Sequence, residues 1–152
     1  MAGLQPIEGG RALLFERLID GEPGQREGKP FILHDRNGLM RSIATELERL
    51  LSTRLSVPPR ALEKRQRGTL DYGIPDGAII SPADPQGCLV LAAQIQAAIV
   101  VFEPRLQDPL VSLRPVATQG NALIADIAAH LVIDGLLEPV SFAIPLGAGD
   151  ER

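Results

Sequence analysis

A stretch of the chain without a single charged residue, Leu89 to Phe102, most constrains how the chain can fold. Four of its side chains recur at steps of three and four residues, the spacing of one helix face: Ala92, Ile95, Ile99 and Phe102. Its only polar residues are Gln94 and Gln96, so we expect a helix that other parts of the fold cover on several sides. Glu103-Pro104 ends it, because proline cannot continue a helix.

A second helix is predicted earlier in the chain, from about Leu39 to Thr53. An apolar stripe runs along this segment at positions i, i+4, i+7 and i+8: Ile43, Leu47, Leu50 and Leu51. Asp35 or Asn37 could cap its start. Val57-Pro58-Pro59 interrupts the pattern beyond it, since proline lacks an amide hydrogen and biases the preceding residue away from helix.

After Pro104 the period changes from that of helices to that of strands. Val140 to Leu146 alternates at period two, and Leu110 to Val116 does so over a shorter stretch. Asn121 to Ile133 is rich in alanine and would also allow a helix, but Asp134-Gly135 between two apolar runs favours a hairpin and therefore strands. We predict an α+β fold in which N-terminal helices precede a three-stranded antiparallel sheet packed on a central buried helix.

The ends of the chain differ from its middle. Arg11 to Ile19 has apolar residues at helical spacing, and a stretch rich in glycine and proline follows it up to Pro30. We divide the chain into an N-terminal helical arm and linker (1–30), an α+β domain (31–146) and a tail (147–152). The first residues do not form a secretory signal, the one cysteine excludes an internal disulfide, and no apolar run reaches the roughly 20 residues that span a bilayer. We expect a cytoplasmic protein that does not insert into membranes.

Charge is distributed unevenly along the chain. Residues 11–67 carry 12 basic and 8 acidic side chains, whereas residues 68–152 carry 3 basic and 10 acidic. The densest basic stretch, Arg49 to Arg67, could contact nucleic acid or an acidic protein, or could be a solvated face. The net charge of −4 and the lack of interleaved aromatic residues argue against nucleic acid as a partner.

Motifs for phosphate, metal or cofactor binding are missing from the sequence. Gly28-Lys29 lacks the glycine spacing of a phosphate-binding loop. His34, His130 and Cys88 each stand without a second nitrogen or sulfur ligand nearby in the sequence. We therefore expect no cofactor, no metal and no small-molecule substrate.

Glycoside hydrolysis is the enzyme activity whose catalytic groups this sequence could most easily supply, because the reaction needs only two carboxylates. Glu103 with Asp108, or Asp71 with Asp76, could supply such a pair. Almost any soluble protein offers pairs of this kind, and the chain has few aromatic residues with which to wall a sugar pocket. We expect that the protein is not an enzyme.

Glu103 and Arg105 flank the proline that ends the apolar helix. Glu103 stands at a helix C-terminus, where the macrodipole disfavours an anion. The extended backbone at Pro104 places both charged side chains on the same side. They could dock against another chain, or form an internal ion pair that braces the corner between helix and strand. From the residues alone we favour the brace.

Three motifs occur together in the order of one protein family. Ser42 to Arg54 is similar to a family helix that ends Leu-Leu-Asn-Thr-Arg, with Ser52 in place of the asparagine, and Thr69 to Asp76 resembles a Leu-Asn-Tyr-Gly-Leu-Pro-Asp turn. The apolar helix that runs into Phe102-Glu-Pro-Arg-Leu106, followed by three strands, completes the match. From about Leu13 to Leu146 the chain resembles the bacteriophage tail baseplate wedge protein and its counterpart in type VI secretion systems, TssE.

The resemblance implies a non-catalytic baseplate subunit that binds the other wedge subunits, TssF and TssG, and helps to start polymerisation of the contractile sheath. It implies that the Glu-Pro-Arg segment serves assembly and that an exposed strand edge could pair with a strand of a sheath subunit. We assign partner binding to residues of the motifs: Glu103, Pro104, Arg105, Leu106, Asp71, Tyr72 and Arg54. A phage tail baseplate is the first alternative. A peptidoglycan hydrolase, suggested by the family's lysozyme-like label, is a less favoured second.

Overall fold

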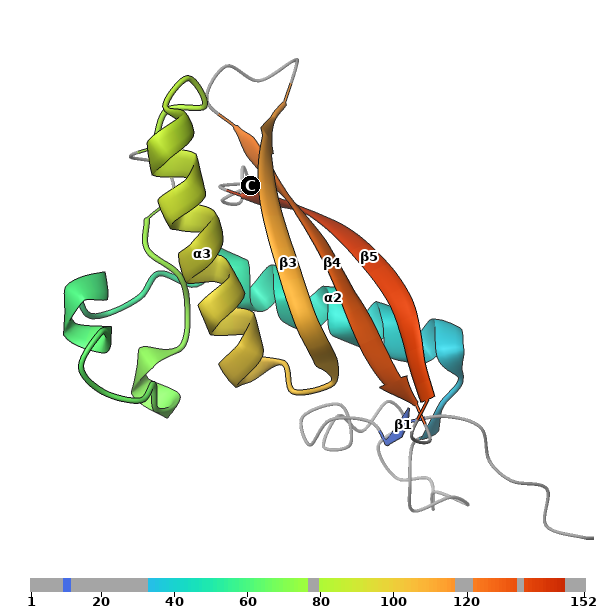
Figure 1. Cartoon of the computed structure of the whole chain (residues 1–152). Coiled ribbons are helices and arrows are strands. Elements are labelled where there is room, and N and C mark those ends of the chain that lie inside the picture. The colour runs from blue at the N-terminus through green and yellow to red at the C-terminus, as the bar shows by residue number, and fades with distance from the viewer. Residues whose placement is uncertain (1–9, 12–32, 77–79, 117–121, 134–135, 147–152) are drawn as a thin grey trace, which may run out of the picture.

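The computed structural model describes residues 10–11, 33–76, 80–116, 122–133 and 136–146. Two short strands come first, β1 (Gly10–Arg11) and β2 (Leu33–His34), and helix α2 (Arg36–Ser52) follows. Two 3-10 turns, η1 (Pro59–Leu62) and η2 (Thr69–Asp71), precede helix α3 (Pro85–Phe102). The three long strands are β3 (Leu106–Pro115), β4 (Leu123–Ile133) and β5 (Leu136–Leu146). This arrangement, shown in Figure 1, confirms the predicted α+β fold.

The three long strands form an antiparallel sheet in which β4 is central. Ile133 pairs with Leu136, so a two-residue connection joins β4 to β5, as the Asp134-Gly135 pattern predicts, although those two residues lie outside the described part. The alanine-rich segment is a strand because every second residue from Leu123 to Leu131 is buried. β3 begins at Leu106, four residues earlier than expected.

One face of this sheet packs on the helices to form the core. α2 crosses that face, and α3 lies alongside β3 (Figure 1). Fully buried aliphatic side chains from all three layers meet there: Ile43 and Leu47 of α2, Leu91, Ile95 and Ile99 of α3, and Ile127 and Leu131 of β4. The apolar stripe predicted for α2 is therefore confirmed as its core face.

The start of α2 is fixed by a side-chain cap. Asp35, one of the two residues predicted to cap the helix, accepts a hydrogen bond from the Gly38 amide at 2.7 Å. Arg36 then reaches β5, where its Nε donates to Glu138 Oε1 at 2.6 Å. The first turn of α2 is thereby attached to the far edge of the sheet.

Three expectations need correction. α3 is covered on one side by the described residues rather than on several, because its other face is aliphatic but exposed. It also begins at Pro85, earlier than the predicted start at Leu89. At the N-terminus, Arg11 lies in β1 opposite Leu33 and not in a helix. The rest of the predicted arm helix and the tail after Leu146 lie outside the described residues, so the domain boundaries stay a prediction.

Candidate partner-binding site

The corner between α3 and β3 is held by an ion pair. Arg105 donates from Nε to Glu103 Oε1 at 2.6 Å and from a terminal nitrogen to Glu103 Oε2 at 2.5 Å. Its other terminal nitrogen donates to Ser42 Oγ of α2 at 2.8 Å. The side chains of Glu103 and Arg105 are 4% and 16% exposed, so the carboxylate is buried and the guanidinium partly so, and each guanidinium nitrogen makes a hydrogen bond. The geometry is that of the internal brace.

A second buried carboxylate lies in η2. Arg65 donates two hydrogen bonds of 2.6 Å to the Asp71 carboxylate, and the Gly68 amide donates to Asp71 Oδ2 at 2.8 Å. Asp71 is 2% exposed. The hydrogen bonds from Arg65 and then from Gly68 lower the pKa of Asp71 from 3.8 to about 2. Asp71 therefore stays ionised and serves to fix the loop before it.

The end of α2 is joined to the turn that follows η2. Arg54 and Ile74 form a parallel bridge, in which the Ile74 amide donates to Thr53 O at 2.9 Å and the Leu55 amide donates to Ile74 O at 2.8 Å. Gly73 has φ +116°, and a Cβ added there would lie 2.6 Å from the Thr53 carbonyl oxygen. Only glycine fits this crossing. Two of the motifs that carry the family resemblance are thus one structural unit.

Tyr72 links that unit to the corner at Glu103. Its ring meets Phe102, the last residue of α3, edge to face with centroids 5.2 Å apart. Burial raises the pKa of the Tyr72 hydroxyl from its ordinary value. The ends of α2 and α3 and the Tyr-Gly-Ile turn therefore pack together.

The structure distributes the seven predicted partner-binding residues between interior and surface. Glu103, Asp71 and Leu106 are buried, at 3%, 2% and 4% exposure. Tyr72 and Arg105 are partly exposed, whereas Pro104 and Arg54 are exposed, and Arg54 pairs with Asp76 at 3.2 Å. Sequence reasoning missed two of the side chains that hold this site, Ser42 and Arg65.

A family model for the baseplate wedge protein gp25 matches residues 37–135, well over half of the chain. The chain belongs to the baseplate wedge family. Among solved structures, it matches a chain of the baseplate complex from the type VI secretion system with a TM-score of 0.52 and 17% identity, over 74% of this chain and 97% of that one. No curated protein matches. The chain is thus a baseplate wedge protein by its family, and it shares the fold of a chain in that secretion baseplate.

The wedge protein exposes an aliphatic surface along α3. We call this surface the α3 stripe: Leu89, Val90, Ala93, Ala97, Val100 and Val101, all of them exposed. Leu89 is 66% exposed and Val100 57%. α3 is also, among the described residues, a helix long and apolar enough to cross a membrane by length and composition. Its opposite face forms part of the protein core, as in the core helix of a globular domain.

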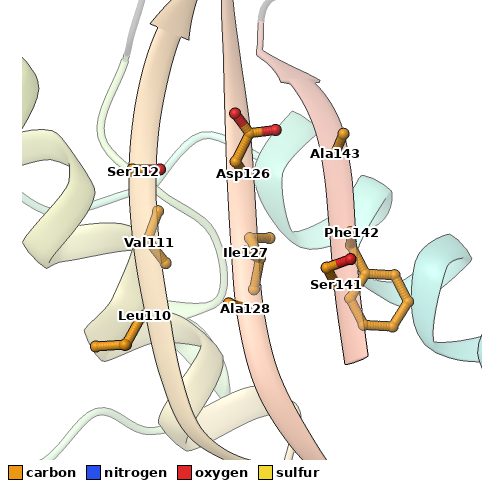
Figure 2. A pocket seen from close by; sticks show the side chains of 9 residues that line it. All are labelled: Leu110, Val111, Ser112, Asp126, Ile127, Ala128, Ser141, Phe142 and Ala143. Atoms are coloured by element: carbon orange, nitrogen blue, oxygen red, sulfur yellow. The ribbon is translucent and has the colours of Figure 1, made fainter. Parts of the chain in front are cut away.

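A shallow hollow of about 400 Å³ lies across the sheet of this wedge protein, as Figure 2 shows. Its lining mixes small side chains, such as Ser112 and Ala128, with larger apolar ones, such as Leu110 and Phe142. Its one carboxylate, Asp126, is held by Arg114 at 2.6 Å. In the part of the chain that the structure describes, no three histidine, cysteine, aspartate or glutamate side chains lie together so that they could hold a metal ion.

Proposed function

We propose that this wedge protein is the TssE subunit of a type VI secretion baseplate, which acts in the cytoplasm, joins TssF and TssG, and helps to start the contractile sheath. The observation that carries the proposal is the α3 stripe. An uncharged aliphatic face of this length is unusual on a protein that functions alone, and it suits packing against other subunits. Ala93 and Ala97 in its middle would let a partner helix approach closely. A phage tail baseplate offers the same kind of partner and is the alternative.

The open edge of β5 supports the sheath part of the proposal. Among the described residues, β3 and β5 are the two edge strands of the sheet. Each carries two prolines: Pro109 and Pro115 in β3, and Pro139 and Pro145 in β5. Proline is tolerated in an edge strand where its missing amide hydrogen faces away from the ladder. By the strand alternation, the Ser141 and Ala143 amides then face the open edge between two prolines. A strand of a sheath subunit could pair there through backbone hydrogen bonds.

The carboxylates favour an assembly role over peptidoglycan hydrolysis. A glycosidase needs one carboxylic acid that is protonated at its working pH. Asp71, with a pKa of about 2, cannot hold that proton, and both Glu103 oxygens are occupied by Arg105. The hollow on the sheet contains one paired aspartate rather than two free carboxylates.

Co-purification of the tagged full chain with TssF and TssG tests the proposal. Leu89→Gln and Val101→Gln should each reduce capture about tenfold or more, because each removes one buried aliphatic side chain from the interface. Leu136→Gln is the matched control, since Leu136 is 74% exposed but lies away from the stripe, on β5. Equal capture by all three variants, or no capture by the wild type, would contradict the assignment.

The sheath contact is tested in the same preparation with the sheath subunit. Ser141→Pro removes an amide at the open edge and should abolish capture of that subunit. Ser141→Ala keeps the amide and should capture normally, so the pair separates a backbone contact from a side-chain contact. If Ser141→Pro remains folded and still captures the sheath subunit, the β5 edge is not the contact.

A further inference from the structure

We propose that the loop of residues 55–73, here called the basic loop, is a docking site for an acidic segment of another protein that carries an aliphatic side chain among its carboxylates. The inference rests on charges and burial within the loop. It does not depend on the assignment of the α3 stripe or the β5 edge, which lie on other elements.

The basic loop is fixed before any partner arrives. The Arg54–Ile74 bridge closes its base, and Ser56 Oγ donates to Leu70 O across it at 3.1 Å. The two hydrogen bonds from Arg65 to Asp71 hold its later half. A loop held in this way loses little conformational entropy when it binds, so modest contacts are enough for recognition.

The positive charge of the loop is not neutralised from within. Four basic and two acidic residues lie between 55 and 73. One of the acids, Asp71, is buried and already held by Arg65. Arg60 and Lys64 are exposed, and no ion pair to either is found in the part of the chain that the structure describes. These two cations are available to carboxylates of a partner.

Arg67 adds a third cation to the loop. One terminal nitrogen of its guanidinium is buried and has no hydrogen-bond acceptor among the residues that the structure describes. The guanidinium is therefore not fully satisfied within this part of the chain. The rest of the Arg67 side chain is partly exposed. A carboxylate brought to this edge of the loop would meet the accessible part of the Arg67 side chain, which adds a third positive charge beside Arg60 and Lys64.

Leu70 decides between a protein and a nucleic acid. It is 89% exposed and lies in η2 between Arg67 and the anchored Asp71. An exposed aliphatic side chain beside cations suits a peptide with both carboxylates and an apolar residue. A DNA duplex would be bound through its phosphates by cations alone and would leave this leucine without a contact, and a single strand would stack its bases on aromatic side chains. The one aromatic residue of the loop, Tyr72, is packed edge to face on Phe102.

Fluorescence anisotropy with the full chain tests this proposal. The probe is a labelled peptide of glutamates and aspartates around one central leucine, compared with its glutamine and asparagine counterpart. Binding should be specific to the acidic peptide and should weaken as salt rises. Arg60→Glu and Lys64→Glu should each weaken it about fivefold, which is the upper range for one exposed ion pair. Arg41→Glu, an exposed arginine of α2 outside the loop, is the control with the same charge change and should bind normally.

A second comparison isolates the aliphatic contact. Replacing the central leucine of the peptide by glycine should weaken binding to the wild type but not to Leu70→Ser, which keeps the backbone carbonyl that accepts from Ser56. Thermal unfolding checks that every variant is folded. The proposal is overturned if Arg41→Glu weakens binding as much as the loop variants, or if the wild type binds a DNA duplex more tightly than the acidic peptide.

Discussion

The Arg105 guanidinium donates hydrogen bonds to two partners, the Glu103 carboxylate two residues away and the Ser42 hydroxyl 63 residues away in the sequence. The first contact fixes the turn out of α3, and the second ties that turn to α2. A buried ion pair repays its desolvation only when its hydrogen bonds are complete. Both Glu103 oxygens accept from Arg105, and the remaining guanidinium nitrogen donates to Ser42, so the main effect of the pair in the isolated chain is to hold the corner.

Substitutions at this corner should distinguish the cost of leaving Glu103 unpaired from the cost of removing both charges. Arg105→Ala leaves Glu103 buried and unpaired, and should lower the free energy of unfolding by about 3–5 kcal/mol. The double variant Glu103→Met with Arg105→Met should be closer to wild type, since no unpaired charge remains. Urea denaturation measures both. If Arg105→Ala instead unfolds at the wild-type urea concentration, the brace is wrong and the interface interpretation of the Glu-Pro-Arg segment gains.

Asp71 should make the stability depend on pH in a defined window. Its folded pKa of about 2 lies below the ordinary 3.8, so the Arg65 ion pair contributes fully above about pH 5 and is lost as pH falls toward 2. Asp71→Asn should therefore be less stable at pH 7 and lose less stability between pH 4 and pH 2. Denaturant unfolding across this range measures the difference. Asp126→Asn, at an exposed ion pair, should change the profile less; an equal change would remove Asp71 from this role.

At the scale of elements, the joint between α2 and the turn at Gly73 depends on one close backbone approach. The positive φ of Gly73 and its contact with Thr53 O leave no room for a side chain. Gly73→Ala should therefore cost more than about 1 kcal/mol in the free energy of unfolding. Gly68→Ala is the matched control, because a Cβ there meets only an ordinary contact at 3.9 Å. Equal midpoints for the two variants in urea would contradict the close approach.

The sequence predicted the positions of the helices and strands better than it predicted which of their faces are covered. Period-two alternation identified β5, because that strand is buried on one face only, and Asp134-Gly135 decided the alanine-rich segment in favour of strand β4. The expected coverage of α3 was wrong, because a helix that is apolar on all sides has the same sequence pattern whether its own fold covers one face or several. The site was predicted in part. Ser42 carries no signal in a helix, and Arg65 resembled the other cations around it, because both act through partners that only the fold brings near.

At the scale of the whole molecule, one core joins every long element. Buried side chains from α2, α3 and the three strands belong to a single cluster, with Ile74 of the turn included. The chain has one tyrosine and no tryptophan. Tyr72 therefore reports on the joint between the helices, while circular dichroism reports on the helices themselves.

The shared core predicts a single cooperative transition. Tyr72 fluorescence and circular dichroism at 222 nm should give the same midpoint in urea. Leu47→Ala in α2 and Ile127→Ala in β4 should each lower that midpoint for both signals together, at a cost of about 2–5 kcal/mol. A fluorescence change that precedes the circular dichroism change would mean that the joint unfolds separately from the core.

The paired prolines of β5 have a consequence for the accuracy of assembly. The carbonyls of a strand that joins this edge can accept hydrogen bonds from two β5 amides, those of Ser141 and Ala143. Pro139 and Pro145 flank these two amides and donate none. If that strand slid by one repeat in either direction, one of its carbonyls would face a proline and lose its donor. The edge would thus admit a partner in one alignment and reject the shifted ones. A first subunit placed correctly in this way would set the alignment of every later subunit stacked upon it.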